Sequence, residues 1–276
     1  MPISILILTL NEEQNLPACL ESVKWSDDIV VFDSFSTDLT VEIAKAAGVR
    51  VIRRTFDNYG AQRSAALNEV DYKHPWLLMV DADERCTPEL SREIEEKLKH
   101  PELDMALYRI RRKDYFMGRW LRHSSGYPTW FGRLMRVGHV RIERTINEEY
   151  HTNGGVGFLQ AHLAHYPFNK GFSTWLEKHN RYSTMEAELL EEGGRKAHAL
   201  SEIWHKDPTV RRKLIKSYAY RLPGRPLIMF LSLYLFRGGI LEGRAGFIYC
   251  ALRSFYEFMI NCKAEENRLR RRGLPL

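Results

Sequence analysis

Two acidic residues separated by one residue form the clearest chemical signal in the sequence. Asp81 and Asp83 come directly after the apolar run WLLMV (76–80). A buried strand that ends at this point presents both carboxylates, close enough to share one hard cation such as Mg²⁺ or Mn²⁺ with a diphosphate. Acidic residues are common in the loops that follow strands. The pair therefore indicates a metal site only if the surrounding elements position both carboxylates.

Two further polar clusters also follow apolar runs. Thr9 and Asn11 lie at the end of the run 3–9, and Asp33 ends the run 28–33. Apolar runs alternate with helical patterns over the first hundred residues, which is typical of βαβ units and a mostly parallel sheet. Ligands of such sheets bind beyond the carboxyl ends of the strands. We therefore expect all three clusters to meet at one edge of the sheet.

The elements predicted from the hydrophobic pattern are as follows. Strands are expected over 3–9, 28–33, 49–53 and 76–81, with helices over 12–23, 37–47 and 59–70 between them. A helix over 88–99 and a strand over 106–116 come next, then two strands, expected to be antiparallel, over 129–136 and 155–165. Helices are predicted near 172–190 and at about 197–221, 226–237 and 242–270, after a boundary at Gly193-Gly194.

The net charge of +6 is divided unevenly along the chain. Residues 1–194 carry 24 basic and 29 acidic residues, whereas residues 195–276 carry 17 and 6, which gives net charges of −5 and +11. The basic part contains the ten-residue apolar run Leu227–Phe236 and ends in the basic run Arg268–Arg272. Ten residues are about half of a membrane span. We predict attachment to an anionic membrane surface without crossing it; the alternative is a core helix with a solvated basic face.

Composition and cysteine content set the broad class and the compartment. The 276 residues are 44% hydrophobic and 28% charged, which fits a globular protein and excludes a disordered or fibrous chain. The 4 cysteines have no CxxC spacing, so we expect neither a disulfide framework nor a zinc cluster. We therefore expect the protein to be in a reducing compartment. The start MPISILILTLNEE has no basic segment before its apolar run and is interpreted as a strand, not a signal peptide. A cytoplasmic protein, peripheral on the inner face of the cytoplasmic membrane, is expected.

Four segments resemble the inverting family 2 glycosyltransferases of the GT-A fold, in order and in spacing. They are ILILTLNEEQNLPACLESV (5–23), IVVFDSFSTDLTVEIAKAAGVRVI (29–52), YGAQRSAAL (59–67) and LLMVDADERCTPEL (77–90). The resemblance is weaker through 115–188 and is closest to the branch that builds lipopolysaccharide cores and surface polysaccharides. It implies a mostly parallel Rossmann-like sheet with an antiparallel extension on the acceptor side. The helical region that follows is expected to associate with a membrane because of its charge and its apolar run.

The resemblance also assigns roles on the nucleotide side. It makes Asp33 the partner of the base, accepting from the imide N–H of a uracil, with Thr9 and Asn11 lining the same pocket. An alternative for Asp33 is an acid at the start of a helix. The glycine that the family usually carries after the pair Asp-Ser is Phe35 in this chain, which changes the expected conformation of the loop.

Four residues are assigned to the diphosphate and its metal. The resemblance places Arg63 toward the nucleotide, Asp81 near the ribose with a share in the metal site, and Asp83 on the metal, while a late histidine, His165, completes the site in some GT-A enzymes. The metal, Mg²⁺ or Mn²⁺, would stabilise the departing diphosphate. A solvated arginine and a structural histidine are the alternatives for Arg63 and His165.

Inverting transfer also needs a general base that takes the proton of the acceptor hydroxyl. In the resembling branch this acid lies after the arginine-rich strand, where the chain has Asn147, Glu148 and Glu149. Glu148 is the predicted base, with Glu149 as its competitor, and two exposed loop acids are the alternative. The aromatic and basic loop 115–133, which ends at Arg133, is suited to stacking on sugars and pairing with acceptor phosphates.

The predicted activity is sugar transfer from a nucleotide diphosphate sugar, UDP-linked, to a lipid-linked or lipopolysaccharide acceptor. Residues 1–100 form the donor-binding half, 101–194 the acceptor-side half, and 195–276 the basic helical region. A sugar nucleotidyltransferase is the alternative enzyme, although a glycine-rich phosphate loop with a nearby lysine is missing after the first strand. A non-catalytic scaffold on a membrane or nucleic acid is the other alternative. The acidic residues assigned to the site are all present, which argues against a non-catalytic scaffold. The apolar run between basic residues favours a membrane over nucleic acid as the partner.

Overall fold

The computed structural model describes residues 2–99, 104–143, 149–191, 204 and 224–276. The chain forms two compact units. Unit 1 contains Met1–Lys113 and Pro128–Asn169, and unit 2 contains Asp114–Tyr127 and Lys170–Leu276. The boundary predicted at Gly193-Gly194 and the helix predicted at about 197–221 lie outside the described residues, apart from Trp204.

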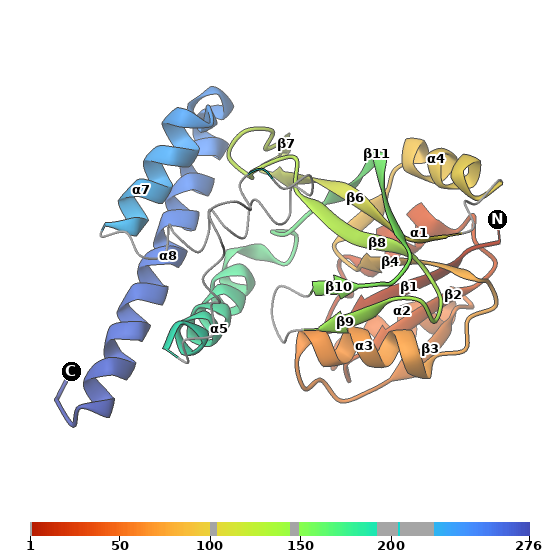
Figure 1. The fold of residues 1–276 in the computed structure, drawn as a ribbon, viewed down its shortest axis with the longest axis horizontal. Coiled ribbons are helices and arrows are strands. Elements are labelled where there is room, and N and C mark those ends of the chain that lie inside the picture. The colour runs from red at the N-terminus through yellow and green to blue at the C-terminus, as the bar shows by residue number, and fades with distance from the viewer. Residues whose placement is uncertain (1, 100–103, 144–148, 192–203, 205–223) are drawn as a thin grey trace. The chain divides into compact units, whose positions relative to one another are not determined.

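Four parallel strands form the first half of the sheet of unit 1, in the order β3-β2-β1-β4 (Figure 1). They are β1 (Ser4–Thr9), β2 (Ile29–Asp33), β3 (Arg50–Arg53) and β4 (Trp76–Asp81). The connecting helices are α1 (Leu16–Val23), α2 (Thr40–Ala46) and α3 (Tyr59–Glu69). The predicted βαβ alternation is therefore confirmed, and the four strands begin and end within one residue of the predicted bounds.

The sheet continues from β4 through antiparallel strands in the order β4-β8-β6-β11-β5. These are β8 (Trp130–Arg136), β6 (Met105–Phe116), β11 (Gly155–His165) and the short β5 (Glu84–Cys86), with α4 (Pro88–Lys99) between β5 and β6 along the chain. A separate pair consists of β9 (Arg141–Glu143) and β10 (Glu149–His151). The three long strands match the predicted ones. The short strands β5, β9 and β10 were not predicted, because three residues are too few to show a periodicity.

The parallel strands β1, β2 and β4 are largely apolar on both faces because helices cover both sides of the sheet. Ile5 and Ile7 of β1 pack in one cluster with Leu16 of α1, whereas Leu6 packs in the opposite cluster with Ala66 of α3. All of these side chains are buried. The two clusters fix β1 at the centre of the unit, and with it the position of Thr9 at the end of the strand.

Two helices begin later than the sequence pattern predicts. The predicted start of α1 at residue 12 is wrong, because residues 12–15 form a turn in which the Leu16 N–H donates to the Glu12 carbonyl, and the helix starts at Leu16 just before Pro17. The predicted start of α2 at residue 37 is also wrong, since the Asp38 carboxylate accepts from the Thr40 N–H and the helix begins only there. The displaced residues form the loops that border the site.

Unit 2 is mainly helical. It contains β7 (Arg119–Trp120), α5 (Gly171–Glu191), α7 (Arg225–Leu231), its continuation η2 (Ser232–Phe236), η3 (Gly239–Glu242) and α8 (Gly243–Arg271). The predicted helices at 226–237 and 242–270 are confirmed. Within the described part of the chain, no single helix is long and apolar enough to cross a membrane. One pair, Arg225–Phe236 with Gly239–Arg271, meets the length and composition criteria together and is bent by 70° at its break.

Candidate active site

Three strand ends meet at the carboxyl edge of the parallel sheet, as predicted. The register pairs Thr9 with Asp33 across β1 and β2, and Leu8 with Asp81 across β1 and β4. Because the three strands are adjacent and parallel, their last residues share one edge of the sheet. The polar groups at 9–11, 33–36 and 81–84 therefore form one continuous site within unit 1.

Asp33 is buried and is held by neutral donors. Its carboxylate accepts a hydrogen bond from the Thr9 hydroxyl at 2.9 Å and another from the Ser36 backbone N–H at 2.9 Å. The Arg53 guanidinium lies 3.5 Å from the same carboxylate. The predicted proximity of Thr9 and Asp33 is confirmed, and the donors fix the orientation of an acceptor-only group at the strand end.

Asn11 and Phe35 are both in the left-handed backbone region, with φ of 55° and 59°. The Asn11 N–H donates to the Ser36 hydroxyl and its side-chain oxygen accepts from the Thr37 N–H, both at 2.8 Å. Asn11 thus ties the loop after β1 to the loop after β2. Phe35 adopts the conformation that glycine favours, although it is not glycine, and its half-exposed ring lies 4.5 Å from the Arg53 guanidinium.

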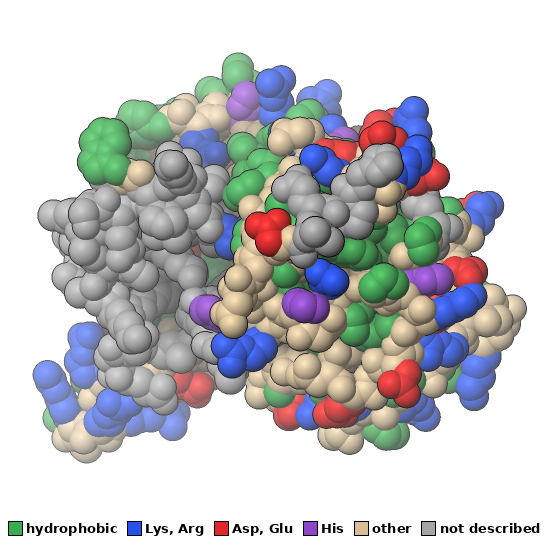
Figure 2. Space-filling model, turned by 45° about the vertical axis from the view of Figure 1, so that its right-hand side comes forward, with side chains coloured by type: hydrophobic (Ala, Val, Ile, Leu, Met, Phe, Trp, Pro, Cys, Tyr) green, Lys and Arg blue, Asp and Glu red, His purple; other side chains and the backbone are tan. Residues whose placement is uncertain are grey.

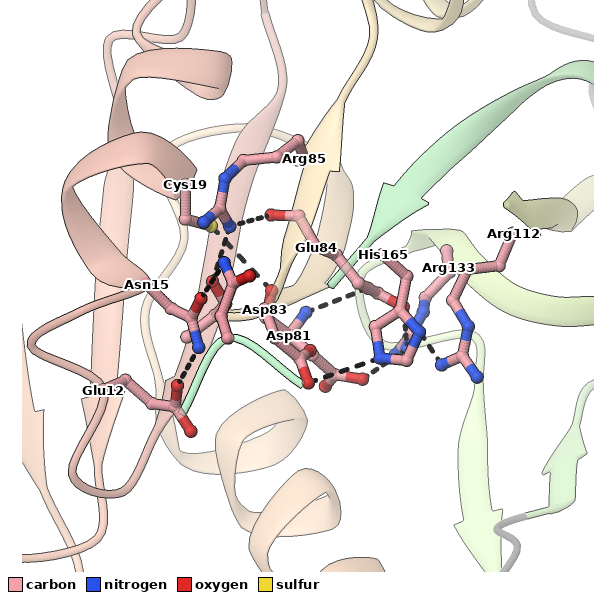
Figure 3. A network of polar contacts seen from close by, with 12 residues as sticks. Glu12, Asn15, Cys19, Asp81, Asp83, Glu84, Arg85, Arg112, Arg133 and His165 are labelled. Carbon is pink, nitrogen blue, oxygen red and sulfur yellow. Dashed lines mark hydrogen bonds and ion pairs between the residues drawn. The ribbon is translucent and has the colours of Figure 1, made fainter. Parts of the chain in front are cut away.

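Asp81 is held between two arginines. Its two carboxylate oxygens lie 2.7 Å from Arg63 of α3 and 2.5 Å from Arg133 of β8. Arg133 also contacts Glu84 at 2.8 Å, and the Glu84 carboxylate accepts from the Asp81 N–H at 3.0 Å (Figure 3). Arg112 of β6 is 3.5 Å from Glu84. Arg63 is therefore a buried partner of Asp81, which corrects the alternative of a solvated arginine.

Electrostatics keeps this network charged. Burial would raise the pKa of Asp81, but Arg133 and Arg63 outweigh it and hold that pKa well below its ordinary value. Burial would lower the pKa of Arg133, but the carboxylates of Asp81 and Glu84 raise it instead. The Cys19 thiol, 3.8 Å from the Asp81 carbonyl, has its pKa raised mainly by burial and stays protonated. Asp81 and Arg133 thus remain ionised at neutral pH.

Asp83 and His165 come together across 82 residues of sequence. His165 Nε2 lies 3.3 Å from an Asp83 carboxylate oxygen, and Figure 3 shows the two side chains facing each other. Backbone pairing fixes this contact, because His165 is opposite Glu84 in the β11–β5 ladder and the Tyr166 N–H donates to the Asp83 carbonyl at 2.9 Å. The Asp83 side chain keeps 18% of its surface exposed, whereas that of Glu84 has none.

These two residues are suited to a cation that a substrate helps to hold. No group of three or more His, Cys, Asp or Glu residues within the described ranges forms a complete metal site. Mg²⁺ in proteins is commonly held by one or two carboxylates together with substrate phosphates, not by an all-protein cage. The partly exposed Asp83 carboxylate and the imidazole of His165 beside it fit this mode of binding. Both oxygens of Asp81 already face guanidinium groups.

Glu84, Arg133 and Arg112 are the site residues that the sequence reasoning missed, although Arg133 was noted as an acceptor-side residue. A signal for Arg133 existed, because an arginine in a strand that is expected to be buried needs an acidic partner. A second missed group is Asn15, which is buried, donates to Glu12 at 2.8 Å and accepts from Asn169 at 2.9 Å. The predicted base Glu148 lies outside the described residues, and its competitor Glu149 is the first residue of β10.

Comparison of the sequence with known protein families identifies the family to which these strands and acids belong. The sequence model of glycosyl transferase family 2 matches residues 4–164, which include the whole edge from Thr9 to Glu84. The chain belongs to glycosyl transferase family 2. The family assignment made from the four sequence segments is thus confirmed, and so is the α/β fold class with its antiparallel extension and C-terminal helices.

Relatives of this glycosyltransferase extend along nearly its full length. It is 29% identical to the lipopolysaccharide core biosynthesis glycosyltransferase LpsC of Rhizobium meliloti (strain 1021), over 95% of this chain and 92% of the relative. It is 27% identical to an uncharacterized glycosyltransferase of Rickettsia typhi (strain ATCC VR-144 / Wilmington), over 99% and 89% of the two chains. The glycosyltransferase therefore has a homologue in lipopolysaccharide core biosynthesis.

Solved structures show a partial likeness. Glucosyl-3-phosphoglycerate synthase from Mycobacterium tuberculosis, in complex with Mn²⁺, UDP-glucose and phosphoglyceric acid, matches with a TM-score of 0.34 and 23% sequence identity. The match covers 42% of this glycosyltransferase and 44% of the synthase chain.

Proposed function

We propose that this glycosyltransferase moves a sugar, with inversion, from a UDP-linked donor to a lipid-linked or lipopolysaccharide core acceptor. The observation that carries the proposal is the convergence of Asp33, Asp81 and Asp83 at one sheet edge, with Asp83 beside His165. The match to a lipopolysaccharide core glycosyltransferase over nearly the whole chain supports the acceptor class.

Asp33 is suited to recognise the base of the donor. Its carboxylate is already oriented by Thr9 and Ser36, which limits the conformational freedom it loses on binding. Because the side chain is fully buried, this role requires the loop after β2 to move so that a ring N–H can reach the carboxylate. An imide N–H, as in uracil, provides that donor. Asp33 thereby favours uracil over bases that present only an acceptor at the same point.

Asp83 and His165 would hold Mg²⁺ or Mn²⁺, and the cation would offset the charge that develops on the leaving diphosphate. Asp81 would position this pair rather than carry the cation, since Arg63 and Arg133 occupy its oxygens. The two arginines fix the backbone of residues 81–84, and that backbone directs the Asp83 carboxylate toward His165. Glu148 would take the proton from the acceptor hydroxyl, on the opposite side of the sugar from the diphosphate.

The metal assignment is tested by UDP binding with and without Mn²⁺. We expect Asp83→Ala to weaken Mn²⁺-dependent UDP binding and to abolish sugar transfer, because a diphosphate would then face this acidic edge without its cation. Asp71→Ala, an exposed acid before β4, removes the same charge and is the matched control. Equal UDP affinity in EDTA and in Mn²⁺ would contradict the assignment.

The base assignment is tested with Glu148→Gln and Glu149→Gln. The amide keeps the shape of the side chain but cannot accept a proton at neutral pH, so Glu148→Gln should lower transfer by about 10²- to 10⁴-fold with unchanged UDP binding. An inactive Glu149→Gln beside an active Glu148→Gln would move the base by one residue. Transfer by both variants at the wild-type rate would remove the base from this segment.

A further inference from the structure

Helix α7 and its continuation η2 are apolar on every side. Residues 226–236 contain no charged side chain. One side packs on α8, where the rings of Phe230 and Tyr234 lie 5.8 and 5.7 Å from the ring of Phe247. The other side is exposed and consists of Leu227, Ile228, Leu231, Leu235 and Phe236. A helix that is hydrophobic all round is typically buried in a core or in a membrane, and among the described residues of unit 2, α8 packs against one of its sides.

The two helices form a hairpin with an apolar tip. Arg225 pairs with Glu257, and the Ser254 hydroxyl donates to the Pro226 carbonyl at 2.7 Å, so α7 runs back along the first half of α8 (Figure 1). The turn at the other end exposes 86% of Phe236, 50% of Ile240 and 75% of Leu241. These three residues are called the apolar tip. Their exposure is large for side chains of this type, so the tip is a candidate binding surface.

The exposed charged residues of the described turn at the apolar tip, Arg237 and Arg244, are positive. Glu242, the acid of the turn, is buried and accepts hydrogen bonds from the backbone N–H groups of His123 and Ser124, at 2.6 and 3.2 Å. Arg237 donates to the Tyr127 carbonyl at 3.2 Å and remains exposed, as does Arg244. Hydrophobic side chains bordered by exposed arginines, with the neighbouring acid turned inward, complement an apolar layer beneath a layer of phosphates.

We propose that the apolar tip and the outer side of α7 insert into the interfacial region of an anionic lipid bilayer. Phe236, Ile240 and Leu241 would lie at the boundary of the acyl chains, while Arg237 and Arg244 contact lipid phosphates. Interfacial helices of this kind bury their apolar side about 5–10 Å into the bilayer and bind through apolar area and charge together. The proposal does not depend on the sugar-transfer reaction.

The apolar tip and the C-terminal basic run belong to different ends of α8. The helix spans Gly243–Arg271, and 29 residues at 1.5 Å each give a length of about 40 Å. Figure 2 shows the Lys and Arg side chains gathered at that far end, at the lower left. There Arg268 and Arg270 pair with acids one turn before them, Glu265 and Glu266. The proposal therefore assigns the attachment to the tip, whereas the sequence analysis also included the basic run Arg268–Arg272.

Vesicle flotation of the full chain tests this assignment. The vesicles are phosphatidylethanolamine with phosphatidylglycerol, and pure phosphatidylcholine is the neutral comparison. The double variant Phe236→Ser/Leu241→Ser should reduce flotation at least about tenfold, equivalent to ~1.4 kcal/mol of binding. Its matched control, Val156→Ser/Leu176→Ser, removes two exposed apolar side chains elsewhere and should float like the wild type.

A second pair of variants separates the two ends of α8. Arg237→Gln/Arg244→Gln and Arg270→Gln/Arg271→Gln remove the same charge, and only the first should weaken flotation and its sensitivity to salt. Flotation that is lost only in the second variant, or unchanged in the apolar double variant, would overturn the proposal. A third outcome would also overturn the proposal. If the wild-type protein does not float and is dimeric by size-exclusion chromatography, and the apolar double variant is monomeric, the tip is a contact between two copies of the chain.

Discussion

Asp33 and Asp81 end two strands that flank the same central strand, yet their surroundings differ in kind. Asp33 is held by a hydroxyl and a backbone N–H, with one guanidinium at 3.5 Å. Asp81 has a guanidinium on each oxygen, at 2.7 and 2.5 Å. A carboxylate held mainly by neutral donors keeps more of its charge uncompensated, although the Asp33 side chain is fully buried and that of Asp81 is 24% exposed. A carboxylate matched by two cations serves to fix the backbone. The comparison suggests that Asp33 recognises and Asp81 positions.

Removal of Arg133 should have the largest effect on stability. Arg133→Met keeps most of the side-chain volume but leaves Glu84, which is fully buried, and Asp81 without this buried cation. Breaking a buried ion pair by removing one partner costs about 3–5 kcal/mol, so the free energy of unfolding in urea should fall by about that amount. Arg92→Met on the exposed side of α4 is the control and should change it little. A loss below about 1 kcal/mol, the value typical of exposed pairs, would mean that the network is not structural.

The pH dependence of stability should change in the same variant. The folded pKa of Asp81 is below its ordinary value of about 3.9. Its contribution is therefore fully present above that value and is lost as the pH falls below it. Arg133→Met should weaken this loss, so the difference in unfolding free energy between wild type and variant should shrink below pH ~4. Parallel curves for the two proteins between neutral and acid pH would contradict the role of Arg133.

Single substitutions around Asp33 should lower the free energy of unfolding by less than Arg133→Met does. Ser36→Ala removes a hydroxyl that contacts Asp33 and accepts from the Asn11 N–H, while the Ser36 N–H bond to Asp33 remains. A lost hydrogen bond of this kind costs about 1 kcal/mol of unfolding free energy. UDP affinity should fall as well, because Asp33 loses part of its orientation. A cost equal to that of Arg133→Met would remove the distinction between the two acids.

The smallest effect concerns Phe35 and its positive φ of 59°. Alanine and glycine both remove the contact between the ring and Arg53, but only glycine also relieves the backbone strain, which is about 1–2 kcal/mol for other residues. Glycine loses about 0.5–1 kcal/mol through its freer unfolded chain. Thermal unfolding should therefore show Phe35→Gly to be slightly more stable than Phe35→Ala. The opposite order would indicate that the loop relaxes when the ring is removed.

The parallel half of the fold could be predicted from the sequence because its information is local. Each strand is an apolar run bounded by polar residues, and the parallel order then brings Thr9, Asp33 and Asp81 to one edge. The starts of α1 and α2 could not be predicted in the same way. Side chains and backbone groups of the two loops bond to each other, as Asn11 does with Ser36 and Thr37, and those partners are about 25 residues away along the chain.

The arginine network was harder to predict for a related reason. Arg133 reaches Asp81 only because β8 inserts between β4 and β6, and the order of antiparallel strands is not contained in a periodic pattern. The left-handed conformation of Phe35 was equally hidden, since the residue type disfavours it. The family resemblance indicated a glycine at that position, and the φ of 59° shows that Phe35 adopts a backbone conformation that glycine favours.

The residue-for-residue pairing of β5 with β11 ties the Asp83–His165 pair to one register of the strand ladder. Cys86 is opposite Leu163 and Glu84 is opposite His165, so the ladder, together with the arginines that hold residues 81–84, sets the distance between the two side chains. Insertions at loop positions between residues 87 and 154, outside the strands that carry Arg112 and Arg133, leave this register in place. A single deletion inside β11, by contrast, would shift the register and turn His165 to the opposite face of the sheet. Loop lengths can thus vary across this fold, while the Asp83–His165 pair stays under a strict one-residue constraint.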